Sequence, residues 1–145
     1  MNWQTFGVQR LKAYEARLKA AESIPERIKM LELEYGSIKA GIGDGMPKAS
    51  GGNKAEDQLV GNIAKREELK NNLEIARREI ELTEKGLSVL DDEEKRVLYV
   101  FFINRPNRHV ELLCDELHIE KTKLYNLKDE ALKKFTMGCY GVVEL

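Results

Sequence analysis

Apolar residues in the last third of the chain are spaced as in two short helices separated by a tight turn. Two runs of apolar positions with helical spacing lie between residues 110 and 135. They are Val110, Leu113, Cys114 and Leu117, and then Leu124, Leu127, Ala131, Leu132 and Phe135. The intervening His118-Ile119-Glu120 is too short for a loop and out of phase with one straight helix. The pattern therefore predicts a helix-turn-helix, in which the first helix supports the second.

The second of these helices is predicted to have an apolar side and a polar side. Leu124 and Leu127 are expected to pack against the first helix, where Cys114 is small enough to let the helices cross. The polar side can donate hydrogen bonds to base edges and positive charge to phosphates. The residues expected to contact bases are Lys121, Thr122, Tyr125 and Asn126, and those expected to contact phosphates are Arg105, Arg108, Lys123 and Lys128. The alternative interpretation is an ordinary pair of core helices with a solvated polar face.

The N-terminal part of the chain is predicted to form two helices, over residues 2–21 and 23–40. Ser23 is the expected N-cap of the second helix, with Glu26 three residues later and Pro25 in the first turn. Residues 41–52 contain five glycines and one proline, which predicts a flexible loop. A phosphate-binding loop is excluded here, because the segment follows a helix and no Gly-Lys-Ser/Thr comes after it.

A long helix is expected to follow, from Asn53 as N-cap to about residue 85. Leu59, Leu73, Ile80 and Leu87 share one heptad position, and Asn62, Leu69, Ala76 and Thr83 share the adjacent one. Asn62 and Arg66 interrupt this apolar seam, so a strong dimeric coiled coil is not predicted. The helix is instead expected to pack against the first two helices of its own chain, with a second copy completing the burial in a homodimer.

The pattern breaks at residues 86–90, which are expected to link two parts of the chain. Asp91 is the expected N-cap of a further helix over residues 92–104, which would pack across the helix-turn-helix. The predicted fold is therefore all-α. An N-terminal helical hairpin and a long helix form an oligomerisation or interaction module over residues 1–86, and a three-helix DNA-binding domain occupies residues 87–145.

Three segments of this C-terminal part carry a resemblance to a known group of proteins. They are LCDELHIE (113–120), LYNLK (124–128) and ALKKF (131–135). They resemble the fourth region of bacterial sigma factors, and more closely the sigma-like domain of the RinA/ArpU group of phage late transcriptional regulators. The resemblance is strongest over residues 87–137. His118 stands where the sigma pattern has a turn glycine, and Glu120 stands where it has a serine N-cap.

Composition adds limits to this interpretation. The net charge is −1, so any basic surface must be local, and residues 120–135 hold five lysines against three acids. Two cysteines are too few for a disulfide framework; Cys114 is expected in the core and Cys139 in a C-terminal tail. Without a signal peptide or a membrane-length apolar run, the expected location is the bacterial cytoplasm. No catalytic or metal-ligand constellation is seen, so neither an enzyme nor a cofactor is expected.

The resemblance implies a phage- or prophage-encoded transcriptional regulator that activates late genes, binds double-stranded DNA and meets the host RNA polymerase. Two alternatives stay open. One is a DNA-packaging protein like a terminase small subunit, which also joins a helix-turn-helix to a helical oligomerisation region. The other is a sigma-like module that contacts RNA polymerase and does not bind DNA, and the near-neutral charge favours it.

Overall fold

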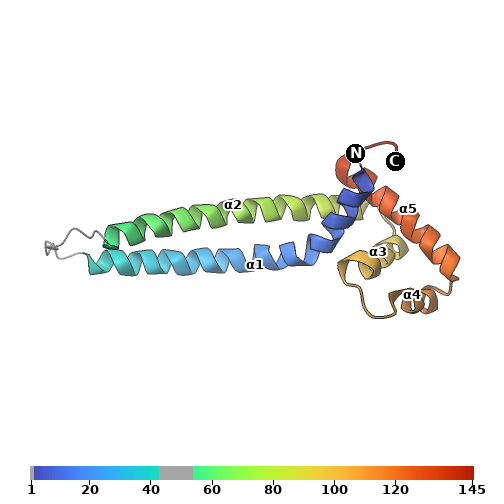
Figure 1. The fold of residues 1–145 in the computed structure, drawn as a ribbon, viewed down its shortest axis with the longest axis horizontal. Helices are drawn as coiled ribbons and strands as arrows, with labels where there is room; N and C mark the ends of the chain where they lie inside the picture. The colour runs from blue at the N-terminus through green and yellow to red at the C-terminus, as the bar shows by residue number, and fades with distance from the viewer. Residues whose placement is uncertain (1, 43–53) are drawn as a thin grey trace. The chain divides into compact units, whose positions relative to one another are not determined.

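A computed structural model describes residues 2–42 and 54–145, and in this part of the chain all regular elements are helical. This confirms the predicted all-α class. The elements in chain order are α1 (Trp3–Gly41), α2 (Lys54–Ser88), α3 (Asp92–Leu98), a π-helical turn η1 (Tyr99–Ile103), α4 (His109–Leu117) and α5 (Lys121–Tyr140) (Figure 1). Residues 43–53, which include most of the predicted loop and the predicted cap Asn53, lie outside the described residues.

The predicted break between two N-terminal helices at Ser23 is wrong. α1 is one helix of 39 residues with Pro25 in its interior. Ser23 does not act as a cap, and its hydroxyl donates instead to the carbonyl of Ala20 at 3.5 Å. A proline inside a helix removes one backbone hydrogen bond, here the one to the Ala21 carbonyl, and its ring crowds the same carbonyl. The helix formers that surround Pro25, mostly Ala, Glu, Lys, Arg and Leu, outweigh this local cost.

The chain divides into two compact units. One contains residues 1–18 together with residues 78–145, and the other contains residues 19–77. α1 and α2 therefore each contribute to both units. The functional boundary predicted at residue 86 falls within α2 and remains a prediction.

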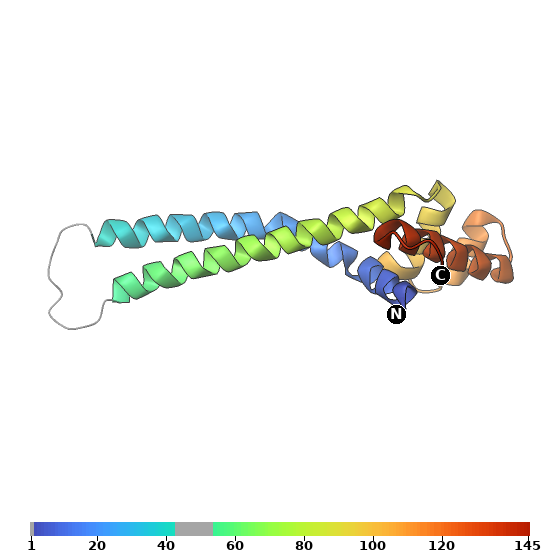
Figure 2. The same ribbon diagram turned by 90° about the horizontal axis from the view of Figure 1, so that it is seen from above.

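The unit of residues 19–77 consists of one segment from α1 and one from α2, which lie side by side (cyan and green in Figures 1 and 2). Its seam contains the two polar residues that interrupt the heptad pattern. The Asn62 amide, only 6% exposed, donates to the carbonyl of Leu31 at 2.9 Å. Arg66 donates to the side-chain oxygen of Asn62 at 2.9 Å and lies over the ring of Tyr35. Both polar residues thus have partners within this chain, as expected for a helix that packs against its own chain.

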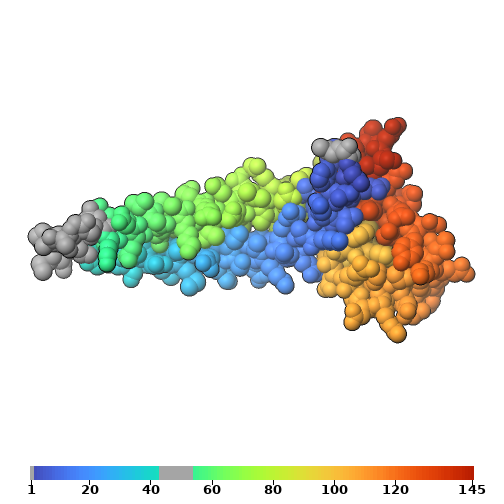
Figure 3. All heavy atoms as spheres, viewed as in Figure 1, coloured from blue at the N-terminus to red at the C-terminus, as the bar shows by residue number. Residues whose placement is uncertain are grey.

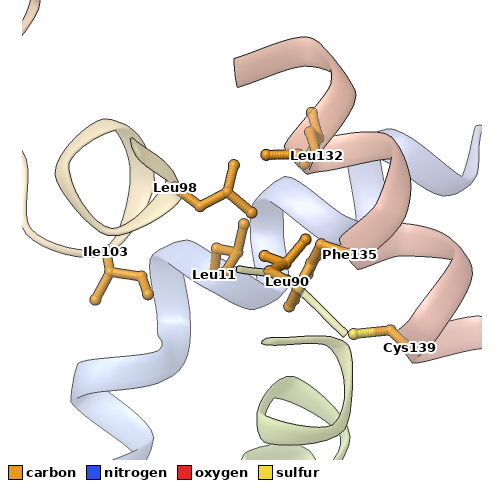
Figure 4. Packing of buried hydrophobic residues seen from close by; sticks show 8 residues of the cluster. Leu11, Leu90, Leu98, Ile103, Leu132, Phe135 and Cys139 are labelled. Atoms are coloured by element: carbon orange, nitrogen blue, oxygen red, sulfur yellow. The ribbon is translucent and has the colours of Figure 1, made fainter. Parts of the chain in front are cut away.

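The other unit has a core that joins the N-terminal end of α1 to the C-terminal helices. Leu11 is fully buried among residues of the later part of the chain (Figure 4). These residues are Leu90, Leu98, Ile103, Ala131, Leu132, Phe135 and Cys139. At the surface of the same unit, the start of α1 (dark blue) meets the end of α5 (red) in Figure 3, where the rings of Trp3 and Tyr140 are 5.1 Å apart. The helices after residue 87 therefore share their core with residues 3–18.

Two predictions for this unit are corrected by the close approach of α2 and α5. The predicted break at residues 86–90 begins later than expected: α2 ends at Ser88, and residues 89–91 link it to α3. Gly86 lies buried within α2, where a Cβ would stand 2.7 Å from Phe135 Cε2. Cys139 is not in a tail but in α5, where it is buried and its thiol donates to the carbonyl of Leu82 at 3.2 Å. Glycine at position 86 thus makes room for the aromatic ring.

The predicted cap of the helix after residue 91 is confirmed. Asp91 accepts a hydrogen bond from the Glu94 amide at 2.8 Å, and the Glu94 side chain accepts one from the Asp91 amide at 3.1 Å. This reciprocal pair is a capping box. The other oxygen of the buried Glu94 carboxylate is 2.8 Å from Lys134 Nζ on α5. The cap therefore also links α3 to α5.

Candidate nucleic-acid interface

α4 and α5 are joined by the three residues His118, Ile119 and Glu120. α4 ends at His118, which adopts the left-handed conformation with φ 55°. The Ile119 amide then donates to the Cys114 carbonyl at 3.2 Å and closes the end of the helix. Glu120 is extended before α5 begins at Lys121, and its side chain makes no capping hydrogen bond. The direction of the chain thus changes within three residues.

A second apolar cluster fixes the start of α5 to α4 and to the preceding helical turn. Leu113 of α4 and Leu124 of α5 are both fully buried, together with residues Val97, Val100 and Phe101. Cys114, Leu117, Ile119 and Leu127 are partly buried around them. One side of the first turns of α5 is therefore internal, as the apolar spacing predicted.

The opposite side of these turns is open to solvent. The four residues expected to contact bases, Lys121, Thr122, Tyr125 and Asn126, are all exposed. Their spacing of i, i+1, i+4 and i+5 places them on one face of the helix. The first turn of α5 contains no acidic residue, whereas the first turn of α3 contains three. The structure therefore brings the four residues together on a surface without neutralising carboxylates in that turn.

The two arginines expected to contact phosphates lie just before the start of α4. Arg108 also has a positive φ, 58°, and its side chain is 82% exposed, with Nε 3.7 Å from the Glu111 carboxylate. Arg105 is exposed and its Nε donates to His109 Nδ1 at 3.2 Å. Burial lowers the pKa of His109, and the charge of Arg105 lowers this pKa further. Both effects favour the neutral imidazole, whose Nδ1 can accept the hydrogen bond from Arg105.

The two lysines expected to contact phosphates differ in their surroundings. Lys123 is exposed. The Lys128 side chain is only 22% exposed, with its Nζ 3.0 Å from Asp129. The same ammonium group lies 5.8 Å from the ring centre of Phe101 and 5.5 Å from that of Tyr125. Lys128 is thus already engaged by one carboxylate and two rings.

Phe101 is a central residue of this region that the sequence analysis did not single out. Its ring meets those of His109 and Tyr125 edge to face, with ring centres 4.9 and 5.9 Å apart. We call Lys121, Thr122, Tyr125 and Asn126 the exposed row of α5. Through its contacts with Tyr125 and Lys128, the buried Phe101 ring supports this row from the core side. The signal in the sequence was the uninterrupted apolar run at 97–103, which is too wide for one helical stripe.

A metal-binding cluster and a membrane-spanning helix are both absent from the described part of the chain. Within residues 2–42 and 54–145, no group of three or more His, Cys, Asp or Glu side chains could hold a metal ion. In the same residues, each helix is too short or too polar to cross a membrane.

Comparison with known proteins gives one family. A search of curated proteins and a search of solved structures both found no matching chain. The family described as "Protein of unknown function (DUF1492)" matches residues 45–136, which is more than half of the chain and includes the whole of α2, α3 and α4 and most of α5. The chain therefore belongs to the DUF1492 family.

Proposed function

We propose that this protein is a sequence-specific DNA-binding regulator of transcription that inserts the start of α5 into the major groove. The observation that carries the proposal is the two-sidedness of α5: four polar residues form an exposed row, while Leu124 behind them is fully buried against α4. A recognition helix needs both properties, since its base contacts must be free and its position must be fixed.

The local charge supports the proposal although the whole chain has a net charge of −1. The first eight residues of α5 contain three lysines and no acid. The positive end of the helix macrodipole lies at the same place, and both favour a phosphate backbone. With Arg105, Arg108 and Lys123 as phosphate partners, the logarithm of the affinity would fall with the logarithm of salt concentration at a slope of roughly −3.

The resemblance to the RinA/ArpU group extends the proposal to biological context. It supports a phage- or prophage-encoded activator of late genes that binds DNA as a homodimer and acts with the host RNA polymerase. A homodimer would require two half-sites about one helical turn apart in the operator. Light scattering of the free protein tests this part, since a ring-sized assembly would point instead to a DNA-packaging protein.

The test of DNA recognition is fluorescence anisotropy with duplexes that tile the neighbourhood of the gene, at two salt concentrations. The test variant is Lys121→Ala/Asn126→Ala, and the matched control is Lys65→Ala/Asn72→Ala. Each variant removes one exposed lysine and one exposed asparagine from a helix. We expect one tile to bind wild type and control equally and the test variant at least tenfold more weakly, since each base contact contributes about 1–3 kcal/mol of discrimination. Equal binding by both variants would refute the proposal.

A second candidate function is a protein-interaction module that contacts RNA polymerase without binding DNA. The surface of α4 favours it, because Glu111, Asp115 and Glu116 are exposed there and Leu112 is 40% exposed beside them. Absence of salt-sensitive binding to any tile, together with binding of purified polymerase that is lost in Leu112→Ala, would select this function.

A further inference from the structure

A polar hollow of about 330 Å³ lies in the unit of residues 1–18 and 78–145, away from the exposed row of α5. Residues of the first half of α1, one residue of α2 and the last residue of α5 line it. We call it the arginine hollow, and it is formed by Phe6, Gln9, Arg10, Arg17, Glu79 and Tyr140. Its volume is within the range of pockets that hold small organic molecules.

Arg10 is fixed in place at this hollow. It forms an ion pair with Glu79, and its Nε donates to the Tyr140 hydroxyl at 3.1 Å. Its guanidinium carbon lies 5.3 Å from the centre of the Tyr140 ring, and its side chain is only 12% exposed. A guanidinium held by these three contacts has little conformational entropy left to lose when it binds a ligand.

Arg17 brings a second guanidinium to the same carboxylate. Its Nη1 is 3.4 Å from the Glu79 oxygen that also pairs with Arg10. This Nη1 atom is buried, and apart from its ion pair with Glu79 it makes no hydrogen bond to the described residues. A buried donor whose hydrogen bonds are not made is costly, so an acceptor supplied from outside would stabilise it.

The balance of charges and donors in the arginine hollow favours an anion. Two guanidinium groups face one carboxylate, which leaves one positive charge in excess. Each guanidinium has five N–H donors in a planar fork that matches the geometry of phosphate. The ring of Phe6, 41% exposed at the same hollow, offers an apolar wall to an organic group attached to that phosphate.

We propose that the arginine hollow binds a small phosphate monoester. Arg10 and Arg17 hold its phosphate group, and Phe6 contacts its organic group. The proposal is independent of DNA binding, because the hollow and the exposed row of α5 share no residue.

The experiment is calorimetric titration and thermal unfolding of the full chain at pH 8. The sodium salt of each probe replaces sodium chloride, so that the ionic strength stays constant. Orthophosphate and phenyl phosphate are the two probes, and both are largely dianionic at this pH. We expect phenyl phosphate to bind more tightly than orthophosphate. At ten times its Kd it should multiply the ratio of folded to unfolded protein about elevenfold and raise Tm by several degrees.

Three variants make the test specific. Arg17→Gln should weaken both probes at least tenfold, whereas Arg27→Gln, an exposed arginine of α1 outside the hollow, should leave both unchanged. Phe6→Leu should remove the preference for phenyl phosphate and leave orthophosphate binding intact. A purely structural ion pair predicts a different result, namely a lower Tm of Arg17→Gln without any change in the response to the probes.

Three outcomes would overturn the proposal. They are no heat and no Tm shift with either probe in wild type, equal responses of wild type and Arg17→Gln, and equal affinities for the two probes. The last outcome would leave a site for free phosphate and exclude the monoester.

Discussion

Replacing Leu11 by alanine tests whether the N-terminal segment belongs to the core of the C-terminal helices. Leu11 is fully buried, and the other buried residues of its cluster come from residues 90–139. The substitution removes three buried carbons, which corresponds to about 2.4 kcal/mol of transfer free energy. A cavity left among rigid neighbours such as Phe135 adds to this cost, so the expected loss of unfolding free energy is about 3–4 kcal/mol.

The assay is urea unfolding followed by tryptophan fluorescence. Trp3 is the only tryptophan of the chain, and its contact with Tyr140 makes it a probe of this unit. With a slope of about 1.5–2 kcal/mol per molar urea, the midpoint should fall by about 2 M. Leu33→Ala is the matched control, because the same side chain is 69% exposed there and its loss should change stability by less than about 0.5 kcal/mol.

Equal midpoints for the two variants would refute the packing of Leu11 in this core.

The same reasoning extends to shortened chains. Residues 87–145 alone lack Leu11 and should not unfold cooperatively. A chain in which a Gly/Ser linker of about eight residues replaces residues 19–77 should keep the unit, because the ion pair of Arg17 with Glu79 places the two ends close together.

Three further predictions concern single positions. Gly86→Ala should destabilise by about 1–3 kcal/mol, because its Cβ would meet the buried Phe135 ring at 2.7 Å, whereas Gly61→Ala, with open space around it, should stabilise by about 0.5–1 kcal/mol; urea unfolding of both measures the contrast. His118→Gly should stabilise by about 1 kcal/mol in the same assay, since glycine adopts the positive φ of 55° without strain, and a loss of stability would contradict that conformation. Burial raises the pKa of the Cys139 thiol to about 11 from 9.0, so the folded state keeps this proton where the unfolded state loses it. The contribution of this thiol to the free energy of unfolding is fully present below pH 9 and is lost as the pH rises towards 11. The free energy of unfolding should therefore fall more between pH 8 and 10.5 in wild type than in Cys139→Ala.

The features that sequence reasoning predicted correctly are encoded locally. The helical spacing of apolar residues changes phase between Leu117 and Leu124, and this change is visible from neighbouring residues alone. It predicts where α4 ends and α5 begins. The Asp91 cap follows equally from the acid three residues later, Glu94, whose side chain completes the capping box. The exposed row of α5 follows from the same helical period, because the residues opposite Leu124 have no apolar neighbour to cover them.

The features that it missed depend on distant parts of the chain. No local pattern connects Leu11 with Phe135, because their contact joins residues more than a hundred positions apart. Gly86 was interpreted as a break, although the same lack of a side chain permits close packing within a helix. Pro25 was interpreted as a helix start, because the cost of an interior proline is visible in the sequence and the compensating helix formers act only in sum.

α5 connects these local and distant features in one rigid element. Its first two turns present the exposed row, and its later turns place Phe135 and Cys139 in the core that contains Leu11. Because a helix is rigid, the contacts at both of its ends determine how the exposed row is oriented. Phe101 fixes the first end through Tyr125, and the N-terminal segment fixes the other. We therefore expect the proposed DNA binding by α5 to require residues 3–18, which lie far from α4 and α5 in the sequence.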